Sequence, residues 1–176
     1  MGIIWINGTH GAGKTTTSRL LQPLLPNAQI LDAEKVGVVL MDIAPGLPET
    51  DNFQHWAPWR PLVVETARRV HEFTGGPLIM PMTVLVEQYW KEISAGLASY
   101  GIPVRHVLLH VDRSVLMDRI QSDPVMGPSA FRFQYVDAYG EALEEWLHAD
   151  AEVIDTTQIT AQAAAEQIAR VVGATH

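Results

Sequence analysis

Residues 8–15 constrain the fold of this chain more than any other segment. Their sequence, Gly-Thr-His-Gly-Ala-Gly-Lys-Thr, fits the pattern G-x-x-x-x-G-K-[ST]. A short apolar run precedes it at residues 3–7, and apolar side chains at helical spacing follow it at residues 15–25. Strand, glycine-rich loop and helix in this order are the context in which the pattern binds phosphate groups. The sequence therefore predicts a phosphate-binding loop at residues 8–15.

The chemistry of this loop assigns roles to its residues. Glycines let successive backbone N–H groups approach the phosphates, and the following helix turns its positive end toward them. We expect Lys14 to reach the β- and γ-phosphates of a nucleotide and the Thr15 hydroxyl to bind Mg²⁺. The role of His10 stays open. The predicted nucleotide contacts are Gly8, Thr9, His10, Gly11, Ala12, Gly13, Lys14, Thr15 and Thr16.

Composition narrows the class of protein. A chain of 176 residues, 47% hydrophobic and 18% charged, is typical of one globular domain spanning residues 1–176. Its net charge of −8 argues against nucleic-acid and anionic-membrane partners. The absence of cysteine excludes disulfides and thiolate sites. Apolar runs are shorter than the roughly 20 residues that span a bilayer, and the first strand leaves no room for a signal peptide, so we expect a cytoplasmic protein.

Alternation of strand-like and helical segments predicts the α/β class. Strands are expected at residues 3–7, 28–32, 78–83, 104–111 and 152–155. Further helices are expected at residues 62–73, 86–100, 114–121, 135–148 and 160–172. Together with the loop, this pattern indicates a P-loop NTPase fold of the kinase-like type, a five-stranded parallel sheet flanked by helices.

Two segments interrupt the alternation. The first, at about residues 42–61, contains four prolines and a group of aromatic side chains beside Arg60. The second, at about residues 122–133, contains Pro124, Gly127, Pro128 and Arg132. Long irregular segments in compact domains are often binding loops or lids, although ordinary surface connections are the alternative. We interpret the first as a substrate-binding insertion and the second as a lid.

Ligands of open α/β sheets bind beyond the carboxyl ends of the strands, which draws attention to Asp32 and Thr83. Asp32 is the best candidate for a catalytic base, because an acceptor hydroxyl must be oriented and must lose its proton as it attacks phosphorus. The alternative is that Asp32 caps the helix that follows it.

Arginines are the groups that stabilise the charge of a transferred phosphoryl group. Arg132 in the lid is expected to close over ATP and to act in catalysis. Arg119 is expected to flank the adenine or the phosphates, and Arg60 to hold the acceptor. Each of the three could instead be a solvated surface residue.

Several other suggestive residues are better explained by packing. His106 and His110 share one face of a strand, but two histidines without a third ligand are more often hydrogen-bonded within a sheet. Met80, Met82 and Trp90 are expected in the core. A switch GTPase is excluded because Asp-x-x-Gly and Asn-Lys-x-Asp motifs are missing, and a large motor ATPase would need a longer chain.

Five segments together resemble the tunicamycin-resistance protein family, the TmrB-like ATP-binding proteins. They are residues 3–15, 32–37, 51–54, 59–60 and 78–83. The resemblance implies an ATP-binding protein that protects a bacterium from tunicamycin, a uridine-containing lipoglycoside. It also implies the wider fold group of nucleoside-monophosphate kinases, shikimate kinase and chloramphenicol phosphotransferase. In that group an Asp after the second strand handles the acceptor hydroxyl, which matches Asp32, and a lid arginine matches Arg132.

Our leading hypothesis is an ATP- and Mg²⁺-dependent phosphotransferase that modifies a hydroxyl of tunicamycin or a similar nucleoside antibiotic. Catalysis is assigned to Asp32, Lys14 and Arg132. Two alternatives stay open, namely ATP-dependent sequestration of the drug without chemistry, and a metabolic kinase for a sugar or hydroxy acid. The preference for ATP over GTP and the oligomeric state are open as well. Substrate contacts are expected from Asp32, Phe53, Gln54, Trp56, Trp59, Arg60 and Thr83.

Overall fold

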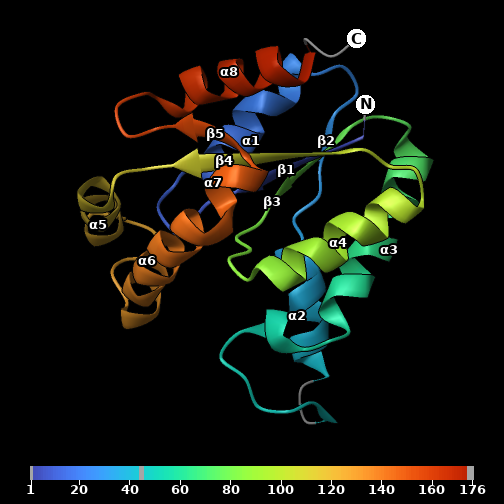
Figure 1. The fold of residues 1–176 in the computed structure, drawn as a ribbon, viewed down its shortest axis with the longest axis horizontal. Coiled ribbons are helices and arrows are strands. Elements are labelled where there is room, and N and C mark those ends of the chain that lie inside the picture. The colour runs from blue at the N-terminus through green and yellow to red at the C-terminus, as the bar shows by residue number, and fades with distance from the viewer. Residues whose placement is uncertain (1, 44–45, 174–176) are drawn as a thin grey trace.

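The computed structural model describes residues 2–43 and 46–173 and shows the predicted α/β fold (Figure 1). Pro45, one of the prolines in the predicted insertion, lies outside the described residues. Five strands form one sheet in the order β2-β3-β1-β4-β5, and every neighbouring pair is parallel. The strands are β1 (Ile3–Asn7), β2 (Gln29–Ile30), β3 (Leu78–Pro81), β4 (Val104–His110) and β5 (Glu152–Asp155).

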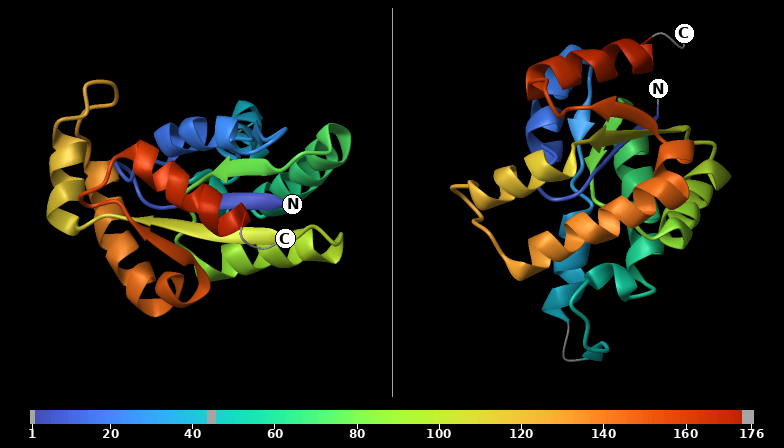
Figure 2. Two further views of the ribbon diagram at one scale, coloured as in Figure 1. Left: turned by 90° about the horizontal axis from the view of Figure 1, so that it is seen from above. Right: turned by 60° about the vertical axis from the view of Figure 1, so that its left-hand side comes forward.

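Helices cover both faces of the sheet. One face is covered by α1 and α8, which pack against each other, and the opposite face by α3 and α4 (Figures 1 and 2). A π-helical segment, Leu143–Leu147, joins α6 to α7. Among the described residues, no helix has the length and apolar character needed to cross a bilayer. The helices are α1 (Lys14–Leu21), α2 (Glu34–Asp42), α3 (Trp59–Thr74), α4 (Glu87–Ser99), α5 (Arg113–Gln121), α6 (Ala130–Ala142), α7 (His148–Asp150) and α8 (Ala161–Gly173).

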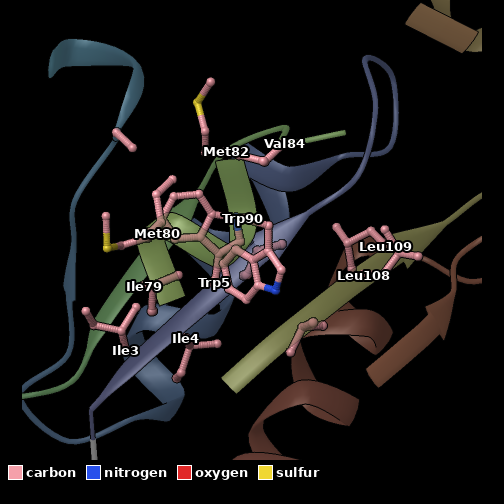
Figure 3. Close-up of a cluster of buried hydrophobic side chains, with 14 of the residues drawn as sticks. Ile3, Ile4, Trp5, Ile79, Met80, Met82, Val84, Trp90, Leu108 and Leu109 are labelled. Atoms are coloured by element: carbon pink, nitrogen blue, oxygen red, sulfur yellow. The ribbon is translucent and has the colours of Figure 1, made fainter. Parts of the chain in front are cut away.

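The core is built around β1, whose five residues are all buried. This continuous burial is expected for a central parallel strand that is covered on both faces. In Figure 3 the indole of Trp5 lies beside that of Trp90 from α4, and the ring centroids are 5.5 Å apart. Met80, Met82 and Trp90 are buried, which confirms that they belong to the core.

The strand order places the phosphate-binding loop at the middle of one sheet edge. Because β1 pairs with β3 on one side and with β4 on the other, the loop that leaves Asn7 is flanked by the ends of both neighbours. The register pairs Ile6 with Pro81 and Asn7 with Leu108. Parallel strands end at the same edge, so the segments after β2, β3 and β5 meet the loop there.

Several predicted boundaries change in the structure, among them those of the second strand and of the two irregular segments. The second strand is shorter than residues 28–32, although the Leu31 N–H still donates to the Ile79 carbonyl at 3.0 Å. The insertion ends earlier than expected because α3 already begins at Trp59. The segment predicted as a lid also ends earlier, since the Ser129 side chain accepts from the Arg132 N–H at 3.2 Å and caps α6. Arg132 therefore lies on a helix.

Candidate functional site

The phosphate-binding loop adopts backbone angles that favour glycine. Gly8, Gly11 and Gly13 have φ values of 141°, 82° and 89°. Gly13 stands immediately before α1, so the N-terminus of that helix opens onto the loop. A side chain at Gly8 would also approach the Leu109 carbonyl to 3.0 Å. These positions explain the glycine spacing of the motif.

Two side chains anchor the start of the loop. The Asn7 Oδ1 atom accepts from the Gly8 N–H at 2.8 Å and from the Val84 N–H at 3.0 Å. The Thr83 hydroxyl donates to the Gly8 carbonyl at 2.6 Å. Thr83 was predicted to contact substrate. In the structure its hydroxyl group donates its hydrogen to the loop and so helps to fix the loop's position.

Lys14 is the first residue of α1, and its Nζ atom reaches back over the loop and donates to the Thr9 carbonyl at 2.9 Å. Burial lowers the pKa of Lys14 from 10.5 to about 8, although the nearby carboxylates of Glu34 and Asp32 raise it. The ammonium group is thus still mostly charged at pH 7 but poorly solvated. A bound phosphate would supply the opposite charge that this group lacks.

Arg132 is almost completely buried, with 5% of its surface exposed. Its guanidinium pairs with Asp123 at 2.8 Å and donates to the Gly127 carbonyl at 2.6 Å. The Nε atom is also buried and finds no hydrogen-bond partner among the described residues. A buried donor without a partner is costly, while the guanidinium of the same residue lines the cavity described below.

Arg119 bridges the loop and the segment after β5. Its Nη2 atom donates to the Thr156 carbonyl at 2.8 Å, and its Nη1 atom lies 3.5 Å from the Gly11 carbonyl. The guanidinium therefore lies beside the phosphate-binding loop, as the prediction of a nucleotide contact requires.

One cavity of about 720 Å³ brings most of the predicted residues together. Its walls come from the loop, the start of α1, the segments after β2 and β3, residues 51–54, the end of α5, the segment between α5 and α6, and α6. Gly8, Thr9 and Ala12 are instead buried inside the loop. The predicted residues that line the cavity are His10, Gly11, Gly13, Lys14, Thr15, Thr16, Asp32, Phe53, Gln54, Thr83, Arg119 and Arg132.

The position of Asp32 is compatible with both roles considered for it. Its Oδ1 atom accepts from the Glu34 N–H at 3.0 Å, which is the helix-capping interaction. The same residue lines the cavity that contains Lys14. A carboxylate has two oxygens, so capping through Oδ1 is compatible with an acceptor hydroxyl bonded to Oδ2.

The predicted substrate contacts of Trp59 and Arg60 are corrected by the structure. Trp59 is fully buried, and its indole packs on Phe53 with ring centroids 5.6 Å apart. Arg60 pairs with Glu92, donates to the Gln54 carbonyl at 2.8 Å and lies 4.3 Å from the ring centroid of Tyr89. Both residues begin α3, which directs them into packing and ion pairing.

Trp56 and Gln54 stabilise the segment before α3. The Trp56 indole donates to the Pro48 carbonyl at 2.8 Å, and Trp56 lines a neighbouring cavity of about 830 Å³, outside the one that holds Lys14. Gln54 is buried and donates to the Thr83 carbonyl at 2.8 Å. Phe53 lines both cavities and is the predicted aromatic residue that reaches the phosphate side.

Gly37 on α2 sets the position of Phe53, because a Cβ atom at Gly37 would overlap the phenyl ring. We expect Gly37→Ala to lower the free energy of unfolding by about 1–3 kcal/mol through overpacking. Urea denaturation measures the change. Gly140→Ala in α6 is the matched control: its Cβ meets open space among the described residues, so a gain of about 0.5–1 kcal/mol is expected. Equal changes in the free energy of unfolding of both variants would contradict the conclusion that Gly37 sets the position of Phe53.

Two aromatic residues of α6 were missed by sequence reasoning. The rings of Phe131 and Tyr135 lie 5.6 and 5.2 Å from that of His10, between centroids. The Tyr135 hydroxyl accepts from Asn52 at 2.7 Å, and its backbone carbonyl accepts from the Thr9 hydroxyl at 3.2 Å. Their spacing of four residues on one helix was the available signal.

The environment of His10 keeps its ring neutral near pH 7. The pKa of His10 is lowered from 6.5 to about 4, mainly by burial and also by the positive charges of Lys14 and Arg132. His10 therefore contributes an uncharged aromatic ring to the cavity wall.

His106 and His110 each have hydrogen-bond partners within the fold. His106 pairs with Asp150 at 2.5 Å, and His110 pairs with the Tyr139 hydroxyl at 2.8 Å. Among the described residues, no three His, Cys, Asp or Glu side chains gather as a metal site.

Residues 3–124 match the protein family described as AAA domain. The chain belongs to this family. The matched region contains the phosphate-binding loop, Asp32 and Arg119, and it ends before α6 begins. No curated protein sequence matches the chain significantly.

Solved structures show that this AAA-domain chain shares the fold of P-loop kinase-like proteins. The tunicamycin resistance protein of Deinococcus radiodurans has a TM-score of 0.80 and 27% identity, over 98% of this chain and 96% of that one. This similarity confirms the predicted resemblance. A sugar kinase from Janibacter sp. HTCC2649 has a TM-score of 0.72 at 19% identity, over 99% and 96% of the two chains. A gluconokinase from Sinorhizobium meliloti 1021 has a TM-score of 0.64 at 18% identity, over 99% of this chain and 98% of that one. Both kinases share the fold of this chain.

Proposed function

We propose that this protein is an ATP-dependent phosphotransferase that phosphorylates a hydroxyl of a tunicamycin-like nucleoside antibiotic. The observation that carries the proposal is that Lys14, Asp32 and Arg132 line one cavity with the phosphate-binding loop. These are the three kinds of group that phosphoryl transfer to an alcohol needs. The structural relative from Deinococcus radiodurans, a tunicamycin resistance protein, supports the choice of acceptor.

Each residue has a defined task in the proposed reaction. The acceptor oxygen forms a bond to the γ-phosphorus of ATP while the bond from that phosphorus to the β–γ bridging oxygen breaks, and ADP leaves. Asp32 orients the acceptor hydroxyl and takes its proton. Lys14, the loop N–H groups and Arg132 stabilise the charge on the phosphoryl oxygens. Thr15 would hold Mg²⁺, which neutralises part of the phosphate charge when bound.

The acceptor end of the cavity combines an aromatic face with polar side chains. Phe53 offers the aromatic face, while Asp51 and Asn52 line the same cavity. A nucleoside presents a flat base and several hydroxyls, so it can stack on the ring and hydrogen-bond to the polar groups. This chemistry favours a nucleoside-containing acceptor over a small sugar or hydroxy acid.

One observation favours a second candidate function, the binding of drug and ATP without transfer. Asp32 uses Oδ1 to cap α2, which is a structural task that requires no proton transfer. In this case the cavity would sequester the antibiotic, and the Asp32 carboxylate would serve only to cap the start of α2.

Mass spectrometry tests the proposal directly. Purified protein is incubated with Mg-ATP and tunicamycin, and the drug is analysed for the addition of one phosphate group with formation of one ADP per product. Omission of ATP is the control. Formation of phosphorylated drug supports the transferase. Tight drug binding without product would instead establish sequestration, and product only from sugars or hydroxy acids would establish a metabolic kinase.

A further inference from the structure

A polar chain runs beneath the phosphate-binding loop, from the buried Asn7 and His106 to the exposed Asp150. The Asn7 Nδ2 atom lies 3.2 Å from His106 Nε2, and His106 Nδ1 lies 2.5 Å from Asp150 Oδ2. Asn7 is completely buried, and 8% of the surface of His106 is exposed. Buried polar groups such as Asn7 and His106 need defined partners, so their hydrogen positions can be worked out.

The contacts of Asn7 determine the protonation of His106. The Asn7 oxygen accepts from the backbone N–H groups of Gly8 and Val84, so the other terminal atom is the NH₂ group. One of its hydrogens goes to the Val84 carbonyl at 2.8 Å, and the other points to His106 Nε2. Nε2 must therefore be the unprotonated acceptor. The imidazole proton resides on Nδ1 and is donated to Asp150.

The surroundings of His106 favour this neutral form. Its ring lies between two indoles, with centroids 4.0 Å from Trp90 and 6.0 Å from Trp146. The charged group that contacts it is Asp150, which also accepts from the Trp90 indole at 2.7 Å. Burial lowers the pKa of His106 despite this carboxylate. A cavity of about 370 Å³ beside the ring is also lined by the charged side chains Arg105 and Glu152.

We propose that His106 is a positioning residue for nucleotide binding, because its neutral imidazole holds the Asn7 amide in the orientation that fixes the phosphate-binding loop. If Nε2 of His106 were protonated, its N–H group and the NH₂ group of Asn7 would both be donors and would face each other without an acceptor. Rotation of the amide would relieve that conflict, but it would turn the NH₂ group toward the N–H groups of Gly8 and Val84. The anchor of the loop would then be lost. The inference rests only on the nucleotide-binding part of the proposed function.

Two substitutions of His106 distinguish the role of Nε2 from that of Nδ1. Glutamine can place an oxygen where Nε2 lies, whereas asparagine can only replace Nδ1. We expect His106→Gln to bind Mg-ATP within about twofold of the wild type at pH 7.5 and His106→Asn to bind about tenfold more weakly, as loss of one buried hydrogen bond predicts. Calorimetric titration measures both constants. Wild-type affinity in His106→Asn would overturn the proposal.

Two measurements that centre on the wild-type protein decide the matter even if His106→Asn fails to fold. Nitrogen NMR of the histidine side chains should show the Nδ1–H tautomer at His106, and an Nε2–H tautomer would overturn the proposal. As the pH is lowered, the Mg-ATP affinity of the wild type relative to His106→Gln should fall where the His106 resonances titrate. A constant ratio through that titration would also overturn it. Because binding is measured, a protein that binds ATP but phosphorylates nothing leaves this inference intact.

Discussion

Replacing Asp32 with asparagine is expected to slow phosphoryl transfer by about 10²–10⁴-fold, the range typical for loss of a general base. The affinity for ATP should stay within about threefold. Asparagine retains the oxygen that accepts from the Glu34 N–H, so the start of α2 stays capped, but its amide cannot take the proton of the acceptor hydroxyl. Single-turnover assays with tunicamycin and calorimetric titration with Mg-ATP measure the two effects separately.

The matched control is Asp42→Asn, which removes the same charge from an exposed position at the other end of α2. This variant should transfer phosphate at the wild-type rate. If Asp32→Asn protects cells from tunicamycin as well as the wild type does, catalysis by this carboxylate is refuted and sequestration is favoured.

Replacing Lys14 with methionine is expected to have opposite effects on binding and on stability. The affinity for Mg-ATP should fall by at least about 100-fold, because the ammonium group is the principal cation on the β- and γ-phosphates. The nucleotide-free protein should become more stable at pH 7 by about 1–3 kcal/mol. The reason is that burial lowers the pKa of Lys14 from 10.5 to about 8, so its charged form opposes folding. This gain is less than the full pKa shift would give, because the Lys14 side chain is only partly buried.

The sign of this effect can be checked by pH. The cost of the buried charge is fully present below pH 8 and disappears as the pH rises toward 10.5, where the unfolded chain also loses its proton. The stability gap between Lys14→Met and the wild type should therefore narrow over this interval in urea denaturation. Lys91→Met, at an exposed residue of α4 that pairs with Glu87, should change stability little. A less stable Lys14→Met protein at pH 7 would contradict the prediction.

The elements around β1 could be predicted because their signals are local. The apolar run, the glycine spacing and the helical pattern after Lys14 all lie within one short segment, and each favours the same structure. The shortness of β2 was not predictable in this way. Its two residues pair with β3 alone at the edge of the sheet, so its length depends on the position of another strand.

The candidate site could be predicted as far as strand ends determine it. Asp32 and Thr83 were found because the ends of parallel strands meet at one edge. Trp59 and Arg60 were misassigned because their environment forms only on folding: Arg60 pairs with Glu92 from another helix. The contact of Tyr135 with Asn52 joins residues 83 positions apart, which local patterns cannot reveal.

That hydrogen bond between Asn52 and Tyr135 has a consequence for the entropy of ligand binding. Together with the bond from Thr9 to the Tyr135 carbonyl, it ties α6 to the segment that contains Asn52 and to the phosphate-binding loop before any ligand arrives. The freedom of these three segments is therefore already restricted when the protein folds. A ligand meets a preorganised cleft, and less of its interaction energy is consumed in ordering the chain around it.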